Sequence, residues 1–552
     1  MQIWNRIHLW LKHRQNLLFL ALVVAHLIPL WAFQYFPSQD GPVHIENARI
    51  IVDYFHPDQA IFRKYYHFNA NPEPTWLGHI VLACLMVIFP PFIVEKIFLS
   101  GYIILFPLSI RYALKSIRPG SEFLAFLLFP FIYNFPLHMG FYSFSYSLPV
   151  FFFLIGYWFK YREEFTRPKI AGLALLSLIL YFCHVVSLAM AYAGIALLTL
   201  WLILFDLVEE RRVRPVEVKL FWKTLRKRGL PLLLAFLPTC ALAAFFFFKQ
   251  GFESQETGIR RSLYWLLKDL IQIESLVSFQ KEESFCSIGL GILLAAILLY
   301  LVALRIKQRR LTRWDGLLAV VVAYAAIYLF APNDLSEGSF ITDRLNLYPF
   351  LALVLWFGVQ PYFRSARRGI MLLAIVIAAA SLGLHTSKYS ELNDALAEYL
   401  SGRHLILPGS TLLPLAFDSR GHGADGRVLS TKVRPFLHAS GHIAAQRHVV
   451  DLTNYEAGAY DYFPILFRSD LNPYRHISIK NRSIVWEPPQ VDFLTYPRRT
   501  GGQVDYVLVW GVQERQQNHE ATKSIRQQLV EGYDLIYTSP RTARMQLYKR
   551  KN

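Results

Sequence analysis

Long apolar stretches separated by short basic segments constrain this chain more than any other feature of its sequence. A helix that crosses the hydrocarbon core of a bilayer needs about 20 mostly apolar residues. About eleven stretches approach that length, at 16–33, 96–113, 121–138, 141–160, 169–184, 186–206, 230–248, 286–305, 315–331, 344–362 and 369–386. With 54% hydrophobic and 17% charged residues, the chain is neither disordered nor an ordinary soluble enzyme. The sequence predicts a polytopic α-helical membrane protein.

The basic residues predict the orientation. Arg6, Lys12 and Arg14 precede the first stretch, so we expect the N-terminus in the cytoplasm. Lys and Arg outnumber Asp and Glu by 57 to 39, a net charge of +18. They gather between apolar stretches at Arg111–Arg118, Lys160–Lys169, Arg211–Arg228, Arg305–Arg313 and Arg364–Arg368. Because cytoplasmic loops concentrate Lys and Arg, topology accounts for the excess, and we expect no nucleic acid as a partner.

A further apolar stretch, Trp76–Pro90, leaves the number of spans open. If it were a twelfth span, the segment Arg111–Arg118 would lie outside and break the alternation of basic loops. If it is a juxtamembrane or re-entrant segment, every basic loop lies inside. We therefore expect eleven spans in the inner (plasma) membrane with the C-terminus outside, and keep twelve as the alternative.

This topology divides the chain into two predicted domains. Residues 1–386 form the transmembrane domain, which includes a first external loop at 34–95 (the first loop). Residues 387–552 form an external soluble domain (the tail). Four segments of the tail show strand or helix patterns, with strands at 504–510, 534–538 and 545–548 and a helix at 519–529. A small α/β domain is expected there.

The first loop opens with Asp40, Gly41 and Pro42, directly after the first span. Pro42 suits the first turn of a helix, and apolar residues then recur at helical spacing up to Phe55. We expect an amphipathic helix along the membrane surface, with Asp40 at its head and a polar side that carries His44 and Asn47. Asp40 is either a helix N-cap or a carboxylate that faces a site at the membrane. His44 and Glu46 are either part of that site or solvated.

Several motifs, in their order along the chain, resemble the GT-C superfamily of membrane glycosyltransferases. They are Asp40-Gly-Pro-x-His44, Asn134-Phe-Pro-Leu-His138-Met-Gly-Phe-Tyr-Ser-Phe144, Cys183-His184-Val-Val-Ser187, Thr342-Asp-Arg344-Leu-Asn-Leu-Tyr-Pro349 and, in the tail, Val504–Trp510. Members of this superfamily take a sugar from a polyprenyl-phosphate carrier. The resemblance implies that Asp40 is catalytic. It also implies substrate-binding roles for His44, Glu46, His138 and His184.

Transfer from a lipid phosphate also needs positive charge beside the departing phosphate. The external segments offer four cations as donor-phosphate ligands, namely Lys249, Arg260, Arg261 and Arg344. Arg344 stands at the mouth of a span, where a charge in hydrocarbon is costly. It is either a phosphate ligand or a residue that snorkels to the headgroups or pairs with Asp343.

The residues leave the cofactor unknown and the need for a divalent metal open. Many GT-C members carry a second acid beside the loop aspartate, where this chain has Gly41, and its nearest acid is Glu46. No pair of external histidines shows zinc-ligand spacing with a third ligand nearby. In the tail, His438 and His442 are four residues apart, but Gly441 intervenes and there is no HExxH motif. We expect them, with His448, at the surface.

These observations predict an integral membrane glycosyltransferase. Its donor would be a polyprenyl-phosphate-linked sugar and its acceptor a lipid or glycan on the non-cytoplasmic face. A transporter or lipid flippase is the first alternative, although two related halves and charges near mid-span are not visible in the sequence. A non-catalytic scaffold that presents its tail is the second, and in it Asp40 would be capped and packed.

Overall fold

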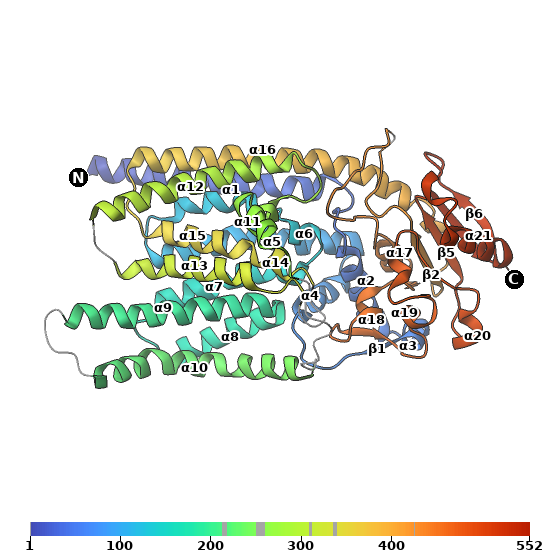
Figure 1. Cartoon of the computed structure of the whole chain (residues 1–552), viewed down its shortest axis with the longest axis horizontal. Helices are drawn as coiled ribbons and strands as arrows, with labels where there is room; N and C mark the ends of the chain where they lie inside the picture. Colours follow the sequence, from blue (N-terminus) through green and yellow to red (C-terminus); the bar gives the residue numbers. More distant parts are fainter. Residues whose placement is uncertain are drawn as a thin grey trace.

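The structure is a computed structural model that describes residues 2–211, 218–249, 260–308, 312–334, 339–423 and 425–551. Its larger part is a bundle of long helices that lie roughly along one direction (Figure 1). They are α1 (Gln2–Ala32), α5 (Pro91–Ile117), α7 (Tyr142–Tyr161), α8 (Arg167–Cys183), α9 (Val185–Arg211), α10 (Val218–Lys249), α12 (Glu283–Gln308), α13 (Gly316–Phe330), α15 (Leu347–Gly358) and α16 (Arg364–Tyr399). Short helices connect them, including η1 (Glu122–Phe131), α6 (Phe135–His138), α11 (Leu263–Ile271), η2 (Glu274–Leu276), η3 (Arg313–Asp315) and α14 (Ile341–Leu345).

Within the described residues, seven helices are long and apolar enough to cross a membrane, namely α1, α5, α9, α10, α12, α13 and α16. The predicted class, a polytopic helical membrane protein with a C-terminal α/β part, is confirmed. The predicted span at 121–138 is instead the buried 3-10 helix η1 followed by α6. The count of eleven spans and the side on which the tail lies stay predictions.

The stretch Trp76–Pro90, which left the count open, forms helix α4 (Trp76–Met86). With 11 residues, it is about 16 Å long at 1.5 Å per residue. This is about half the thickness of a hydrocarbon core. The length of α4 therefore favours the interpretation in which this segment does not cross the membrane as a straight helix.

The tail contains a five-stranded sheet of order β3-β2-β5-β7-β6. Its strands are β2 (Thr411–Ala416), β3 (Val450–Asp451), β5 (Tyr506–Trp510), β6 (Tyr533–Thr538) and β7 (Met545–Arg550). The central strand β5 pairs in parallel with β2 and antiparallel with β7. Every residue of β2 and β5 is buried, as expected of apolar runs covered on both faces. The predicted strands and the predicted helix, now α21 (Glu520–Gly532), are confirmed.

The first loop packs into the tail. Its strand β1 (Tyr66–Phe68) pairs antiparallel with β4 (Ile465–Phe467) of the tail. Its helices α2 (Gly41–Tyr54) and α3 (Ala60–Tyr65), together with β1, place buried apolar side chains in the same hydrophobic cluster as the sheet, among them Ile50, Phe62, Tyr65 and Tyr66. In Figure 1, α2 and α4 lie where the bundle meets the tail. The first loop thus joins the two parts of the chain.

Several short helices complete the tail, namely α17 (Ser440–Arg447), α18 (Tyr455–Ala459), α19 (Pro473–His476) and α20 (Tyr496–Thr500). Helix α17 packs closely on α2, since a Cβ on Gly441 would lie 2.5 Å from the carbonyl oxygen of Pro42. Helix α16 runs unbroken across residue 386, where the predicted domain boundary lies, and connects the bundle to the tail. That division into domains stays a prediction.

The shared core predicts that one apolar side chain of the first loop stabilises the tail. Phe62 is 0% exposed and Phe55, in the same loop, is 71% exposed. We expect Phe62→Ala to lower the free energy of unfolding of the tail by about 3–5 kcal/mol, because it leaves a cavity in a packed core. The matched variant Phe55→Ala should change it by less than about 0.5 kcal/mol. Melting of the purified protein in detergent measures both, and equal melting of the two variants would contradict the shared core.

Candidate functional site

A cavity of about 510 Å³ lies between the bundle and the tail. Its walls are largely aromatic and aliphatic, with Phe141, Phe144, Phe246, Phe247, Phe340, Ile341 and Val185 from the bundle side. Its acidic and basic side chains come from several segments and comprise Asp40, His44, His184, Arg344, His438, Glu456 and Arg482. An apolar pocket of this size with a few convergent polar groups is typical of a small-molecule or lipid site.

Asp40 lies on this cavity, immediately before α2, and is 5% exposed. Asp40 occupies the N-cap position of α2, as one interpretation expected, but its side chain makes no capping hydrogen bond to the helix. Its Oδ1 accepts a hydrogen bond from Gln39 Nε2 at 3.1 Å and lies 3.9 Å from His438 Nε2. Burial raises the pKa of Asp40 to about 7, opposed by the bond from Gln39. This carboxyl group can therefore both bind and release a proton near neutral pH.

The backbone of the turn His138–Gly140 fixes the position of Asp40. The amide of Gln39 donates to the carbonyl of His138, and the amide of Asp40 donates to the carbonyl of Met139, both at 3.0 Å. Gly140 has φ +85°, and a Cβ there would lie 2.4 Å from the amide nitrogen of Gly41. A side chain at position 140 would thus be strained and would collide with the backbone that carries Asp40.

Arg344 lies on the same cavity, in α14. Its Nη1 donates to the carbonyl of Ser339, and its guanidinium lies 4.0 Å from the ring centroid of Phe141. In the described part of the chain, no carboxylate lies within 4.0 Å of it, so the predicted pairing with Asp343 is not formed. Asp343 instead faces Arg261, at 3.9 Å. The guanidinium of Arg344 is half-buried and is available to an anion in the cavity.

The structure brings together only part of the predicted substrate-binding set. His44 and His184 line the cavity with Asp40. His138 does not, because its ring nitrogens contact Ser278 Oγ at 2.8 Å and Tyr389 Oη at 2.5 Å in a buried network. Glu46 is also buried away from the cavity, where burial and the nearby Asp451 raise its pKa well above the ordinary value. His44 and Glu46 are not solvated on an interfacial helix, since both are under 10% exposed.

The other predicted phosphate ligands do not line the cavity. Lys249 forms an ion pair with Glu73 at 2.5 Å. Arg261 contacts Asp269, and Arg260 is exposed to solvent. Of the four cations selected from the sequence, Arg344 alone lines the cavity together with Asp40.

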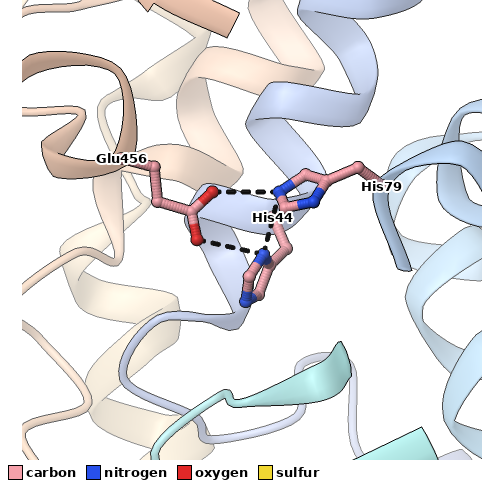
Figure 2. A group of neighbouring side chains, drawn as sticks. All are labelled: His44, His79 and Glu456. Atoms are coloured by element: carbon pink, nitrogen blue, oxygen red, sulfur yellow. Dashed lines mark hydrogen bonds and ion pairs between the residues drawn. The ribbon is translucent and has the colours of Figure 1, made fainter. Parts of the chain in front are cut away.

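A cluster of His44, His79 and Glu456 borders the cavity (Figure 2). His44 Nδ1 lies 3.1 Å from His79 Nε2 and 3.1 Å from Glu456 Oε1. His79 Nε2 lies 2.9 Å from Glu456 Oε2. All three side chains are buried, at 7%, 1% and 0% exposure. Two imidazole nitrogens and a carboxylate that converge in this way could hold a metal ion.

Two asparagines support this cluster from behind. Asn47 Nδ2 donates to Glu456 Oε2 at 2.6 Å, and Asn454 Nδ2 donates to Asn47 Oδ1 at 2.8 Å. The histidines and Asn47 belong to the first loop, whereas Glu456 and Asn454 belong to the tail. Zinc-ligand spacing in the sequence could not indicate this group, because His44 and His79 are 35 residues apart and Glu456 comes from a distant part of the chain.

The expectation of surface histidines in the tail is wrong for two of the three. His438 is 5% exposed and lies on the cavity beside Tyr455, at 4.7 Å between ring centroids. His442 is 2% exposed and packs on Tyr35. His448 is half-buried and pairs with Asp53 at 2.6 Å. Gly441, which made a helix doubtful in the sequence, is the residue that lets α17 approach α2.

One basic residue of the cavity, Arg482, was not identified from the sequence. It lies near Tyr460, whose ring centroid is 4.7 Å from its guanidinium. Arg482 lies in a polar segment that contains no recognisable motif. Its φ of +56° is a property of the structure and cannot be read from the sequence.

No family model and no curated protein sequence matches the chain. Its fold is similar to that of ArnT from Cupriavidus metallidurans in the apo state, with a TM-score of 0.46 and 12% identity over 97% of this chain and 98% of ArnT. It is also similar to an oligosaccharyltransferase from Archaeoglobus fulgidus in the apo form, with a TM-score of 0.41 and 12% identity over 89% of this chain and 69% of that one. Both of these proteins are GT-C glycosyltransferases.

The contact between Gly140 and the backbone of Asp40 predicts a specific effect of a methyl group. Gly140 and Gly120 both have positive φ, at +85° and +92°, but a Cβ on Gly120 would meet nothing within 4 Å. Both alanine variants should incur the strain of a positive φ, on the order of 1–3 kcal/mol. Gly140→Ala should melt at a lower temperature than Gly120→Ala because only it also displaces the chain at Asp40. Equal melting temperatures in detergent would show that the close approach is not required.

Proposed function

We propose that this protein is an integral membrane glycosyltransferase that transfers a sugar from a polyprenyl-phosphate-linked donor to a lipid or glycan acceptor. The observation that carries the proposal is the placement of Asp40 and Arg344 on one cavity with largely apolar walls, at the end of a membrane-spanning bundle. A carboxylate and a guanidinium in such a cavity match the two charges that the reaction develops.

In this reaction the acceptor oxygen attacks the anomeric carbon of the sugar, and the bond from that carbon to the phosphate oxygen breaks. The proton of the acceptor goes to Asp40. Its pKa, which burial raises to about 7, makes the Asp40 carboxylate a stronger base than an exposed aspartate. The bond from Gln39 and the turn His138–Gly140 hold the carboxylate in place during the transfer.

Arg344 binds the phosphate that departs with the polyprenyl chain. Its guanidinium carries a fixed positive charge, and no carboxylate among the described residues neutralises it within 4.0 Å. In an apolar cavity such a charge stabilises a developing phosphate anion more strongly than it would in water. The phenylalanines that surround Arg344, of which Phe141 is the nearest, supply apolar surface for the first units of the polyprenyl chain.

The site belongs on the non-cytoplasmic face of the inner membrane, with the N-terminus in the cytoplasm. Three of the predicted cytoplasmic segments meet at one end of the bundle, because Arg228 and Arg313 both contact Asp206 and Glu163. The tail and the cavity lie at the other end (Figure 1). Basic clusters of this kind favour the cytoplasm, which supports a cavity that opens outside.

The first test removes the charge of the proposed base. Asp40→Asn should lower the rate of sugar transfer from a polyprenyl-phosphate donor in proteoliposomes by about 10²–10⁴-fold, because the amide cannot accept the acceptor's proton. The matched control Asp58→Asn changes an exposed aspartate of the same loop and should transfer at the wild-type rate. Full activity of Asp40→Asn would exclude Asp40 as the base.

The second test addresses the phosphate. Arg344→Gln should lower the transfer rate by about 10²–10³-fold, since it removes the charge that stabilises the leaving group. Arg260→Gln, which removes an exposed cation that does not line the cavity, is the matched control and should leave the rate unchanged. An equal loss in both variants would indicate a general electrostatic effect.

Uptake of the donor without any transferred sugar would favour a transporter or flippase instead of a glycosyltransferase.

A further inference from the structure

Three atoms that face one another in the cluster of His44, His79 and Glu456 compete for few protons. His44 Nδ1 lies 3.1 Å from His79 Nε2 and 3.1 Å from Glu456 Oε1. A neutral imidazole has one N–H and an ionised carboxylate has none. A single N–H on His44 Nδ1 would therefore have to serve both contacts.

The neighbouring groups cannot satisfy all three contacts of the cluster. Glu456 Oε2 already accepts a hydrogen bond from Asn47 Nδ2 at 2.6 Å. Two neutral imidazoles offer one N–H each, and an ionised carboxylate offers none. Whichever ring nitrogens carry these protons, at least one of the three contacts of 2.9–3.1 Å brings together two lone pairs or two N–H groups.

A cation satisfies all three atoms at once. Zinc binds histidine nitrogen at about 2.0–2.1 Å and carboxylate oxygen at about 2.0–2.2 Å, so two ligand atoms of a tetrahedral site lie roughly 3.3–3.5 Å apart. The three separations in the cluster are 3.1, 3.1 and 2.9 Å. Figure 2 shows both imidazoles with one nitrogen turned toward the two oxygens of Glu456. The side chains thus need only small adjustments to admit an ion.

We propose that His44, His79 and Glu456 bind one divalent transition-metal ion of the Zn²⁺ class, and that this ion fastens the tail to the first loop. Two imidazoles favour Zn²⁺ over Mg²⁺ and Ca²⁺, which prefer oxygen ligands. Three protein ligands leave a fourth position for a water or substrate oxygen. Two of the three ligands, His44 and Glu456, line the cavity.

The supporting residues match those of a metal site. Asn47 orients the carboxylate of Glu456, as outer hydrogen bonds do for metal ligands. The ion would bridge parts of the chain that lie 377 residues apart in sequence, from His79 to Glu456. Its removal should therefore weaken the docking of the tail on the first loop.

The test uses the full-length protein in detergent, without any sugar donor, so that it can fail independently of the transfer assay. We expect about one Zn²⁺ per chain by elemental analysis. Treatment with a chelator should lower the melting temperature, and added Zn²⁺ but not Mg²⁺ should restore it. His79→Gln should abolish both the bound zinc and the response to it. His56→Gln, which changes an exposed histidine of the same loop, should retain both.

A second variant separates a metal site from a simple hydrogen-bonded trio if His79→Gln fails to fold. Asn47→Ala leaves all three ligands in place and should weaken Zn²⁺ binding by about 10–100-fold. A hydrogen-bonded trio would instead make the wild-type melting temperature indifferent to chelator and zinc. That indifference, or stabilisation by Mg²⁺ or Ca²⁺ in place of Zn²⁺, would overturn the proposal.

Discussion

The burial of the polar side of helix α2 is the constraint on which the rest of this structure depends. His44, Glu46 and Asn47 are all under 10% exposed, although they begin a short helix next to a membrane bundle. Buried polar groups are costly unless they find partners. The tail supplies those partners for His44 and Asn47 through Glu456 and Asn454. The first loop and the tail therefore have to fold against each other.

This docking creates the cavity in which the proposed chemistry takes place. The bundle contributes Arg344 and the apolar walls, the first loop contributes Asp40, and the tail closes the other side with His438 and Glu456. Neither domain of the predicted division contains the whole site. Because the polar groups are few and the walls are apolar, each charged group lies in a medium of low polarity. Its electrostatic interactions are strengthened there, and its pKa departs from the ordinary value, as that of Asp40 does.

Local patterns predicted much of the fold. Helical spacing after Pro42 predicted α2, and the apolar run Val504–Trp510 predicted the central strand β5. Asp40 and Arg344 were chosen because each lies beside a predicted span, and both line the same cavity. Local patterns could not predict which residues from distant parts of the chain contact each other. Glu456 lies in the short helix α18, and nothing near it in sequence indicates that it will meet His79, 377 residues away.

The most direct test of the proposed site is a structure of the full-length protein in a lipid nanodisc with polyprenyl phosphate bound. The account predicts that the phosphate lies against the guanidinium of Arg344, that the chain runs along the phenylalanines of the cavity, and that Asp40 faces the phosphate across an open space for the sugar. Phosphate bound at Lys249, Arg260 or Arg261, or at the opposite end of the bundle with the cavity unfilled, would contradict it.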